Sequence, residues 1–165
     1  MERASKQMPR RVEYFDDPRA PRANSLVVAV TAVVTNDQGE LLLQKRTDNE
    51  LWGLPGGAMN IGESIAQAVI REVKEETALD VQPTRIVGIY SDPSHVIAYP
   101  DGEVREEFSI CFAARIVGGQ IAVGDQESTE VRFVEQRELE QLPMGTSTRL
   151  RIQHFLEYRG TPYFA

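Results

Sequence analysis

The chain has 165 residues, of which 41% are apolar and 26% are charged, and its formal net charge is −7. This length and composition predict one globular domain and exclude the disordered, collagen-like and coiled-coil classes. The single cysteine, Cys111, excludes an internal disulfide, and no apolar run approaches the roughly 18 residues of a membrane span. The first 25 residues contain no apolar export signal. We therefore expect a cytoplasmic protein with no membrane partner.

The charge is unevenly distributed along the chain. Residues 1–22 carry six basic and four acidic side chains, which leaves a net charge of −9 on the remainder. Because Lys and Arg hold the phosphate backbone of nucleic acids, this acidic remainder argues against a nucleic-acid duplex as the main partner. Two interpretations stay open: an ordinary solvated surface, or carboxylates gathered at one place to hold a cation.

The chain is predicted to begin with an arm over residues 1–25, because this stretch has three prolines, many charges and no apolar period. The arm is expected to be either loose or laid over the domain, which we place at residues 26–165. Residues 26–35 and 40–46 predict a hairpin around the turn Asn-Asp-Gln-Gly. Residues 51–57 (LWGLPGG) are too rich in glycine and proline to predict regular structure.

Residues 64–77 predict a helix. Ser64 followed by Gln67 fits a capping box, and Ile65, Val69 and Val73 recur every four residues as a buried stripe.

The remaining elements alternate between strands and helices. We expect strands at residues 84–90, 107–117, 121–123 and 130–134, and helices at 135–142 and 146–158. Residues 91–106 contain two prolines and predict a long loop of the kind that is functional or mobile. This order predicts an α/β or α+β sandwich with a mixed sheet between helices.

Three carboxylates crowd one edge of the predicted helix. At 100° per residue, Glu72, Glu75 and Glu76 fall within an arc of about 100° beside the buried stripe. Like charges at this spacing destabilise a helix by a few tenths of a kcal/mol each. A hard divalent cation such as Mg²⁺ or Mn²⁺ would reverse that penalty. The alternative is a solvated acidic face with Arg71 and Lys74 as counter-charges, which is the commoner outcome for such a helix.

A longer pattern decides between these interpretations. Residues 57–79 resemble the Nudix box of the Nudix hydrolases, which runs Gly, five residues, Glu, seven residues, then Arg-Glu-apolar-any-Glu-Glu-any-Gly-apolar. The matching residues are Gly57, Glu63, Arg71, Glu72, Val73, Glu75, Glu76 and Leu79. Ala78 stands where the pattern has glycine, and if that position is left-handed the alanine costs roughly 1–2 kcal/mol. The preceding LWGLPGG extends the likeness.

The resemblance implies a Nudix-type α/β/α sandwich that uses Mg²⁺ or Mn²⁺ and water to cleave a nucleoside diphosphate linked to another group. The residues that it implies for catalysis are Glu72, Glu75, Glu76 and Arg71, and for metal binding Glu72, Glu75, Glu76 and the main-chain carbonyl near Gly57. Glu72 is one candidate for the general base, with Glu127 and Glu130 as candidates from a later loop. Arg71 is expected to orient the glutamates, and Glu63 to pair with Arg71 or to cap the helix.

Residues on the substrate side are less well specified. Arg46 could reach a phosphate or meet solvent, and Trp52 could belong to the core or stack on a base. Glu127 and Glu130 could equally be exposed charges. Residues 91–106, which include His95, are the expected specificity loop. In the arm, Tyr14 and Phe15 could cover a nucleobase or pack on a second subunit of a homodimer.

Several functions stay open at this stage. The substrate could be ADP-ribose, a sugar nucleotide or a nucleoside triphosphate, as for MutT-like and ADP-ribose pyrophosphatase-like members of the family. A second hypothesis is a Nudix-like domain that binds a nucleotide and regulates without cleaving it. A third is an acidic interaction module with no ligand.

Overall fold

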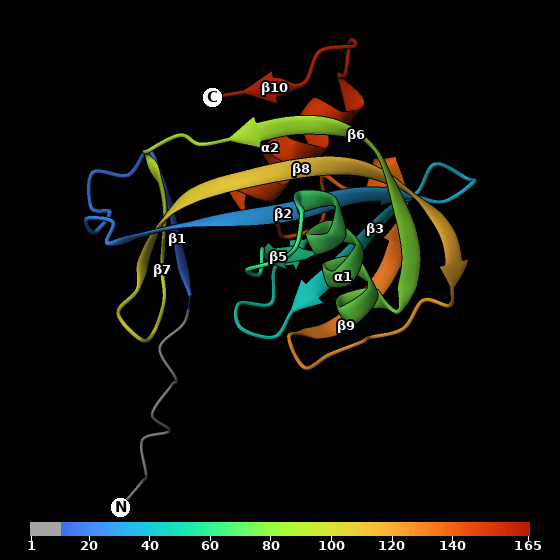
Figure 1. The fold of residues 1–165 in the computed structure, drawn as a ribbon, viewed down its shortest axis with the longest axis horizontal. Coiled ribbons are helices and arrows are strands. Elements are labelled where there is room, and N and C mark those ends of the chain that lie inside the picture. Colours follow the sequence, from blue (N-terminus) through green and yellow to red (C-terminus); the bar gives the residue numbers. More distant parts are fainter. Residues whose placement is uncertain (1–10) are drawn as a thin grey trace, which may run out of the picture.

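The computed structural model describes residues 11–165 of the chain. In this range a mixed sheet lies between two helices (Figure 1). The strands are β1 (Val12–Phe15), β2 (Ser25–Thr35), β3 (Leu41–Arg46), β4 (Trp52–Gly53), β5 (Gly56–Ala58), β6 (Leu79–Tyr90), β7 (His95–Ala98), β8 (Val104–Gly119), β9 (Ser128–Val134) and β10 (Tyr163–Phe164). The helices are α1 (Ile65–Thr77), α2 (Thr146–Leu156) and a short 3₁₀ helix, η1 (Gln136–Glu138).

The long strands β2 and β8 form the centre of the sheet. They run parallel, from Ser25 opposite Arg105 to Thr35 opposite Arg115. On one side, β6 and β7 pair antiparallel with β8; on the other, β3 follows β2 and pairs antiparallel with β9. β1 extends the sheet through β7, and β10 adds to β6 in parallel. The expected mixed sheet between helices is therefore confirmed.

Two apolar cores lie on opposite faces of the sheet, because successive side chains of a strand point to opposite sides. Val30, Ala32 and Val34 of β2 pack with the α1 residues on one face. Val33 packs on the other face in the core that contains Ile152 of α2. The alternation of β2 thus sets which helix covers which face.

Several predicted elements are confirmed. The hairpin is formed by β2 and β3, and α1 begins after the predicted cap, with both hydrogen bonds of the Ser64 and Gln67 capping box present. The strands predicted at residues 84–90, 107–117 and 130–134 lie within β6, β8 and β9, and α2 covers most of 146–158. β6 begins earlier than predicted, at Leu79.

The predicted long loop at residues 91–106 was wrong. β7 and the beginning of β8 form a hairpin there, closed by a turn in which the Tyr99 N–H donates to the Glu103 carbonyl at 2.8 Å. Gly102 adopts a φ of 96° in this turn, a conformation that glycine adopts readily. A strand of four residues has too little alternation to be recognised, and its partner β1 lies 80 residues earlier in the chain.

Three shorter predictions also differ. Residues 121–123 form no strand, because their main chain lies against the C-terminal end of α1. The predicted helix at 135–142 is reduced to η1, and residues 51–57 contain the short strand β4 and the beginning of β5. Within the arm, β1 is laid on β7, while residues 1–10 lie outside the described part.

The residue that departs from the box pattern ends α1. Ala78 adopts the left-handed conformation, with φ 62° and ψ 5°, and its N–H donates to the Lys74 carbonyl at 3.0 Å. Glycine is preferred at this position of a helix because it lacks the Cβ that makes left-handed backbone costly.

We therefore expect Ala78→Gly to stabilise the protein by about 0.5–1 kcal/mol, since relief of backbone strain outweighs the larger chain entropy of glycine when unfolded. The urea midpoint measures the change. Ala66→Gly in the first turn of α1, where the backbone is right-handed, is the matched control and should destabilise. A loss of stability in both variants would contradict the prediction.

Candidate functional site

The amphipathic pattern of α1 places one carboxylate inside the protein. The helix buries Ala68, Val69 and Val73 against the sheet, and Glu76 continues the same face one turn later. Glu76 is only 2% exposed. It accepts a hydrogen bond from the Gly56 main-chain N–H at 2.8 Å and another from the side chain of buried Gln44.

Burial dominates the electrostatics of Glu76. Burial, because a charge in a poorly solvated place is unfavourable, and to a smaller extent the nearby carboxylates Glu72 and Asp125 together raise the pKa of this carboxyl group to about 8. The two hydrogen bonds lower the pKa only in part. Burial likewise raises the pKa of Glu72. Both carboxylates would become ionised more readily beside a positive charge.

Arg71 organises the outer edge of the helix. Its guanidinium lies 2.6 Å from Glu63, 2.7 Å from Glu72 and 3.1 Å from Glu75, and it also donates to the Ala58 carbonyl at 3.1 Å. The pairing of Glu63 with Arg71 is therefore present, and together with the Asn60 N–H it lowers the pKa of Glu63 to about 2. This network connects the loop before α1 to the carboxylates of the helix.

The main chain of β5 approaches Glu72 closely. A Cβ at Gly57 would lie 2.7 Å from the Glu72 carboxylate, nearer than real Cβ atoms come. Pairing of β5 with β2 holds this segment in place, with Gly57 opposite Val30. A larger residue at this position would displace the Glu72 carboxylate from the Gly57 backbone.

A loop from a distant part of the chain completes the acidic group. The last carbonyls of a helix have no partner within it; here the Ala122 and Gly124 N–H groups donate to the carbonyls of Thr77 and Glu76, each at 3.0 Å. Gly124 is required because a Cβ there would lie 2.0 Å from the Glu75 carbonyl. The satisfied helix end thus positions the acidic residues that follow.

Glu76, Asp125 and Glu127 bring one carboxylate oxygen each within 4.8 Å of one another. Sequence reasoning named Glu127 but missed Asp125, which carried no signal beyond its acidic neighbours. Glu75, in contrast, has a side chain that is 55% exposed and contacts Arg71. The position of Glu75 on the helical arc could not show that it is exposed while Glu76 is buried.

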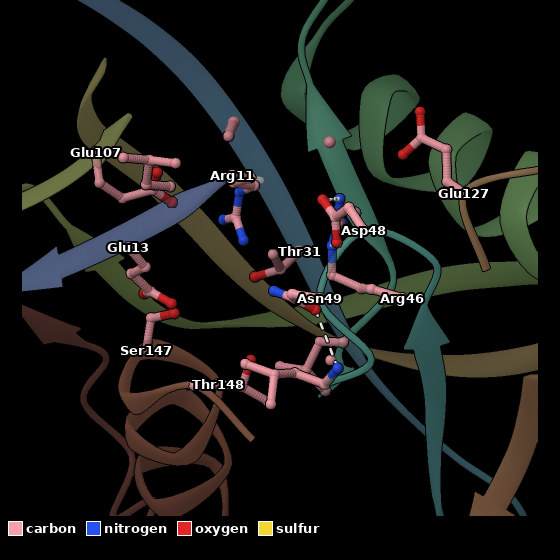
Figure 2. Close-up of a pocket in the computed structure, with 18 of the residues that line it drawn as sticks. Arg11, Glu13, Thr31, Arg46, Asp48, Asn49, Glu107, Glu127, Ser147 and Thr148 are labelled. Atoms are coloured by element: carbon pink, nitrogen blue, oxygen red, sulfur yellow. Dashed lines mark hydrogen bonds and ion pairs between the residues drawn. The ribbon is translucent and has the colours of Figure 1, made fainter. Parts of the chain in front are cut away.

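A cavity of about 610 Å³ opens beside these carboxylates (Figure 2). Gly57, Glu72 and Glu127 line it at one end, and residues of β1, β7, β8 and the beginning of α2 line it elsewhere. Figure 2 shows Glu127 and Glu107 on opposite sides of the view, with Arg11, Thr31 and Arg46 between them. Glu127, the member of the acidic group that lines the cavity, therefore borders a space large enough for a small molecule.

Three of the four candidate substrate-side residues line this cavity. Arg46 lies there in a two-pronged ion pair with Asp48, at 2.9 and 2.8 Å. Trp52 lines the cavity but is 6% exposed and packs in the α2-side core. Glu127 lines it as well, whereas Glu130 on β9 is half exposed, lies 3.5 Å from Arg132 and is outside the lining.

His95 and the aromatic residues of the arm occupy unexpected places. His95 is 3% exposed, and its Nε2 lies 2.6 Å from a Glu13 oxygen. Phe15 packs against the His95 ring at 5.1 Å, and neither Tyr14 nor Phe15 lines the cavity. His95 is therefore covered by β1 and lies outside the cavity lining, whereas Ile97, Tyr99 and Arg105 of the same region line the cavity.

Comparison with known proteins identifies the family of this chain. The model of the NUDIX domain family matches residues 25–155. The chain belongs to the Nudix hydrolase family. Among curated relatives, it is 36% identical over 118 residues to an ADP-ribose pyrophosphatase of Methanocaldococcus jannaschii, covering 70% of this chain and 65% of that protein. It is 32% identical over 102 residues to a putative 8-oxo-dGTP diphosphatase of Bacillus subtilis, covering 62% of each.

The chain thus spans just under two thirds of the length of these two relatives. Among solved structures, the MutT protein of Methanosarcina mazei matches with a TM-score of 0.62 at 24% identity, over 87% of this Nudix chain and 99% of the other. An ADP-ribose pyrophosphatase of Streptococcus suis matches with a TM-score of 0.61 at 23% identity, over 84% of this chain and 98% of the other. At these identities the structures show a shared fold.

Burial of Glu76 predicts a pH dependence of stability in the absence of metal. The pKa rises from 4.5 to about 8 on folding, so the folded protein binds more protons than the unfolded chain between these values. The resulting stabilisation is complete below pH 4.5 and is lost as pH rises through 8, at about 1.4 kcal/mol per pH unit. Glu76→Gln should remove this component.

Urea unfolding in EDTA at pH 5, 6.5 and 8 measures the effect. The free energy of unfolding of the parent protein should fall across this range more steeply than that of Glu76→Gln. Glu140→Gln, at an exposed position, should follow the parent protein. Parallel profiles for the parent and Glu76→Gln would refute the assignment.

Proposed function

We propose that this Nudix protein is a metal-dependent pyrophosphohydrolase that cleaves a nucleoside diphosphate linked to another group. The observation that carries the proposal is the buried Glu76 carboxylate, grouped with Asp125 and Glu127 at the end of a cavity. Such a group is unfavourable without a cation, because desolvated like charges repel one another. Family membership supports the same activity.

The donor atoms suit Mg²⁺ or Mn²⁺, which prefer carboxylate, carbonyl and water oxygens. The proposed ligands are Glu72, Glu75, Glu76 and the Gly57 carbonyl, as the box pattern implies, with Asp125 and Glu127 from the later loop. Glu75 stands at the exposed edge of the set, next to Arg71. A cation at this place would lower the pKa of Glu76 and stabilise its ionised form.

The chain's own residues would have two roles in the reaction, as general base and as the group that positions the base. Bound metal supplies charge neutralisation at the phosphate oxygens and a more acidic water. Glu72 accepts the proton of the attacking water, as one oxygen–phosphorus bond forms and the bridging one breaks to leave two phosphate products. Arg71 holds the Glu72 carboxylate in position at 2.7 Å. Glu127, which also lines the cavity, is the alternative general base. Glu130, the third candidate, lies outside the cavity lining.

Product analysis distinguishes this activity from the competing hypotheses. ADP-ribose, UDP-glucose and dGTP are incubated with the protein, with and without Mg²⁺, and the phosphate-containing products are quantified. We expect cleavage of at least one compound that requires the metal. Binding without cleavage would favour the regulatory nucleotide-binding domain. The absence of both binding and cleavage would favour the acidic interaction module.

We further propose that the chain consists of an arm (1–25) and a domain (26–165) and forms a homodimer. Its partner is proposed to be a small nucleotide rather than a nucleic-acid duplex, and its location the cytoplasm. The acidic net charge supports a small nucleotide rather than a duplex as partner, and the single buried cysteine supports a cytoplasmic location. Within residues 11–165 the helices are too short or too polar to cross a membrane.

Glu76→Gln should abolish metal-dependent turnover while the fold survives, because the amide retains the shape of the side chain but not its charge. Product release at saturating Mg²⁺ and circular dichroism measure the two effects. Glu140→Gln should leave turnover unchanged. Full activity of Glu76→Gln at saturating Mg²⁺ would contradict a metal-binding role of Glu76.

Glu72→Gln should lower kcat by at least about 10²-fold, the lower end of the contribution of a general base. The same variant should retain its unfolding midpoint within the range of Glu140→Gln. If instead Glu127→Gln shows the large loss and Glu72→Gln does not, the base lies in the later loop.

A further inference from the structure

An arginine of the arm faces the cavity. Arg11 directly precedes β1 and lines the cavity, and Figure 2 shows its guanidinium pointing toward Thr31 of β2. The matched family domain begins at residue 25, so this wall of the cavity lies outside the region that the family model covers. The role of Arg11 has to be argued from its own surroundings.

The main chain next to Arg11 is held in place by several contacts. β1 pairs with β7 along its whole length, from Val12 opposite Ala98 to Phe15 opposite His95. The Glu13 carboxylate lies 2.6 Å from His95 and also accepts a hydrogen bond from Ser147 of α2. These contacts link β1 both to the sheet and to α2, and they hold Arg11 at the cavity.

The four arginines that line the cavity differ in their ion pairs. Three of them each form an ion pair: Arg46 with Asp48 at 2.8 Å, Arg105 with Glu103 at 2.9 Å and Arg151 with Glu107 at 3.2 Å. Within residues 11–165, Arg11 forms no ion pair. Its charge is therefore available to a ligand.

Two carboxylates that feel the charge of Arg11 are engaged by other residues. Burial tends to raise the pKa of Glu13 and of Asp48, but hydrogen bonds and positive charges outweigh it, so that the pKa of Glu13 falls to about 2 and that of Asp48 is also lowered. Arg11 is one of these positive charges, which places both groups in its neighbourhood. Glu13 is held by His95 and Ser147, and Asp48 accepts two hydrogen bonds from Arg46. Neither carboxylate reaches Arg11.

We propose that Arg11 binds the phosphate of the substrate diphosphate that is turned away from the Glu76, Asp125 and Glu127 group. This inference rests on the proposed function. A diphosphate carries negative charge on both phosphates, and a cation held by the carboxylates serves one of them. A guanidinium offers paired N–H donors that match the oxygens of the other. β1 thereby makes the arm part of the substrate site.

The test compares Arg11→Ala with Arg11→Lys and Arg19→Ala. Arg19 is the matched control because it lies in the same arm, is 85% exposed and pairs with Asp17. Steady-state kinetics on the compound that the parent protein cleaves give KM and kcat. Calorimetry with α,β-methylene-ADP and Mg²⁺ gives Kd for a diphosphate that resists cleavage between its two phosphorus atoms.

For Arg11→Ala we expect KM and Kd to rise at least about 10-fold, which corresponds to about 1.4 kcal/mol. We expect kcat to change less than KM, Arg11→Lys to recover part of the affinity, and Arg19→Ala to match the parent protein. A Kd and KM for Arg11→Ala within the range of Arg19→Ala overturn the inference while the hydrolase activity stands. If the parent protein binds the analogue through Arg11 but cleaves no compound, the proposed function fails and the inference stands.

Discussion

The candidate site depends on one unfavourable group, the buried carboxylate of Glu76. Its place on α1 follows from the helical period, which continues the stripe of Val69 and Val73. Ordinary packing would put an apolar side chain there. The Gly56 N–H and Gln44 compensate the carboxylate only in part, so the pKa stays near 8. A cation beside this carboxylate would lower its pKa, and the proposed metal site rests on that relation.

Close approaches of main chain to α1 bring the rest of the site to that carboxylate. Gly57 lets β5 lie against Glu72, and Gly124 lets the later loop lie against the carbonyls at the end of the helix. The loop satisfies carbonyl groups that a helix always leaves unpaired at its end. The need to satisfy a helix terminus therefore also delivers Asp125 and Glu127 to Glu76.

The cavity joins this acidic end to parts of the chain that are remote in sequence. β7 was hidden inside a predicted loop, yet it provides the edge on which β1 pairs, and buried His95 fixes Glu13 of that strand. The arm thus serves as a wall of the cavity, with Arg11 facing inward. A segment outside the matched family domain in this way contributes to the same space as the Nudix box.

By itself, the sequence determined the features that depend on local periodicity and spacing. The capping box of α1, the stripe that carries Glu76, the β2 and β3 hairpin and the Nudix pattern all repeat or match over short distances, so they could be read directly. Tertiary structure alone decided which carboxylates meet. Glu75 and Glu76 share one helical arc, but only packing against the sheet buries Glu76 and leaves Glu75 at the surface. Asp125 reaches the site through hydrogen bonds of the loop main chain to a helix end, and Arg11 through a strand pairing across 80 residues, and neither interaction leaves a pattern in the local sequence.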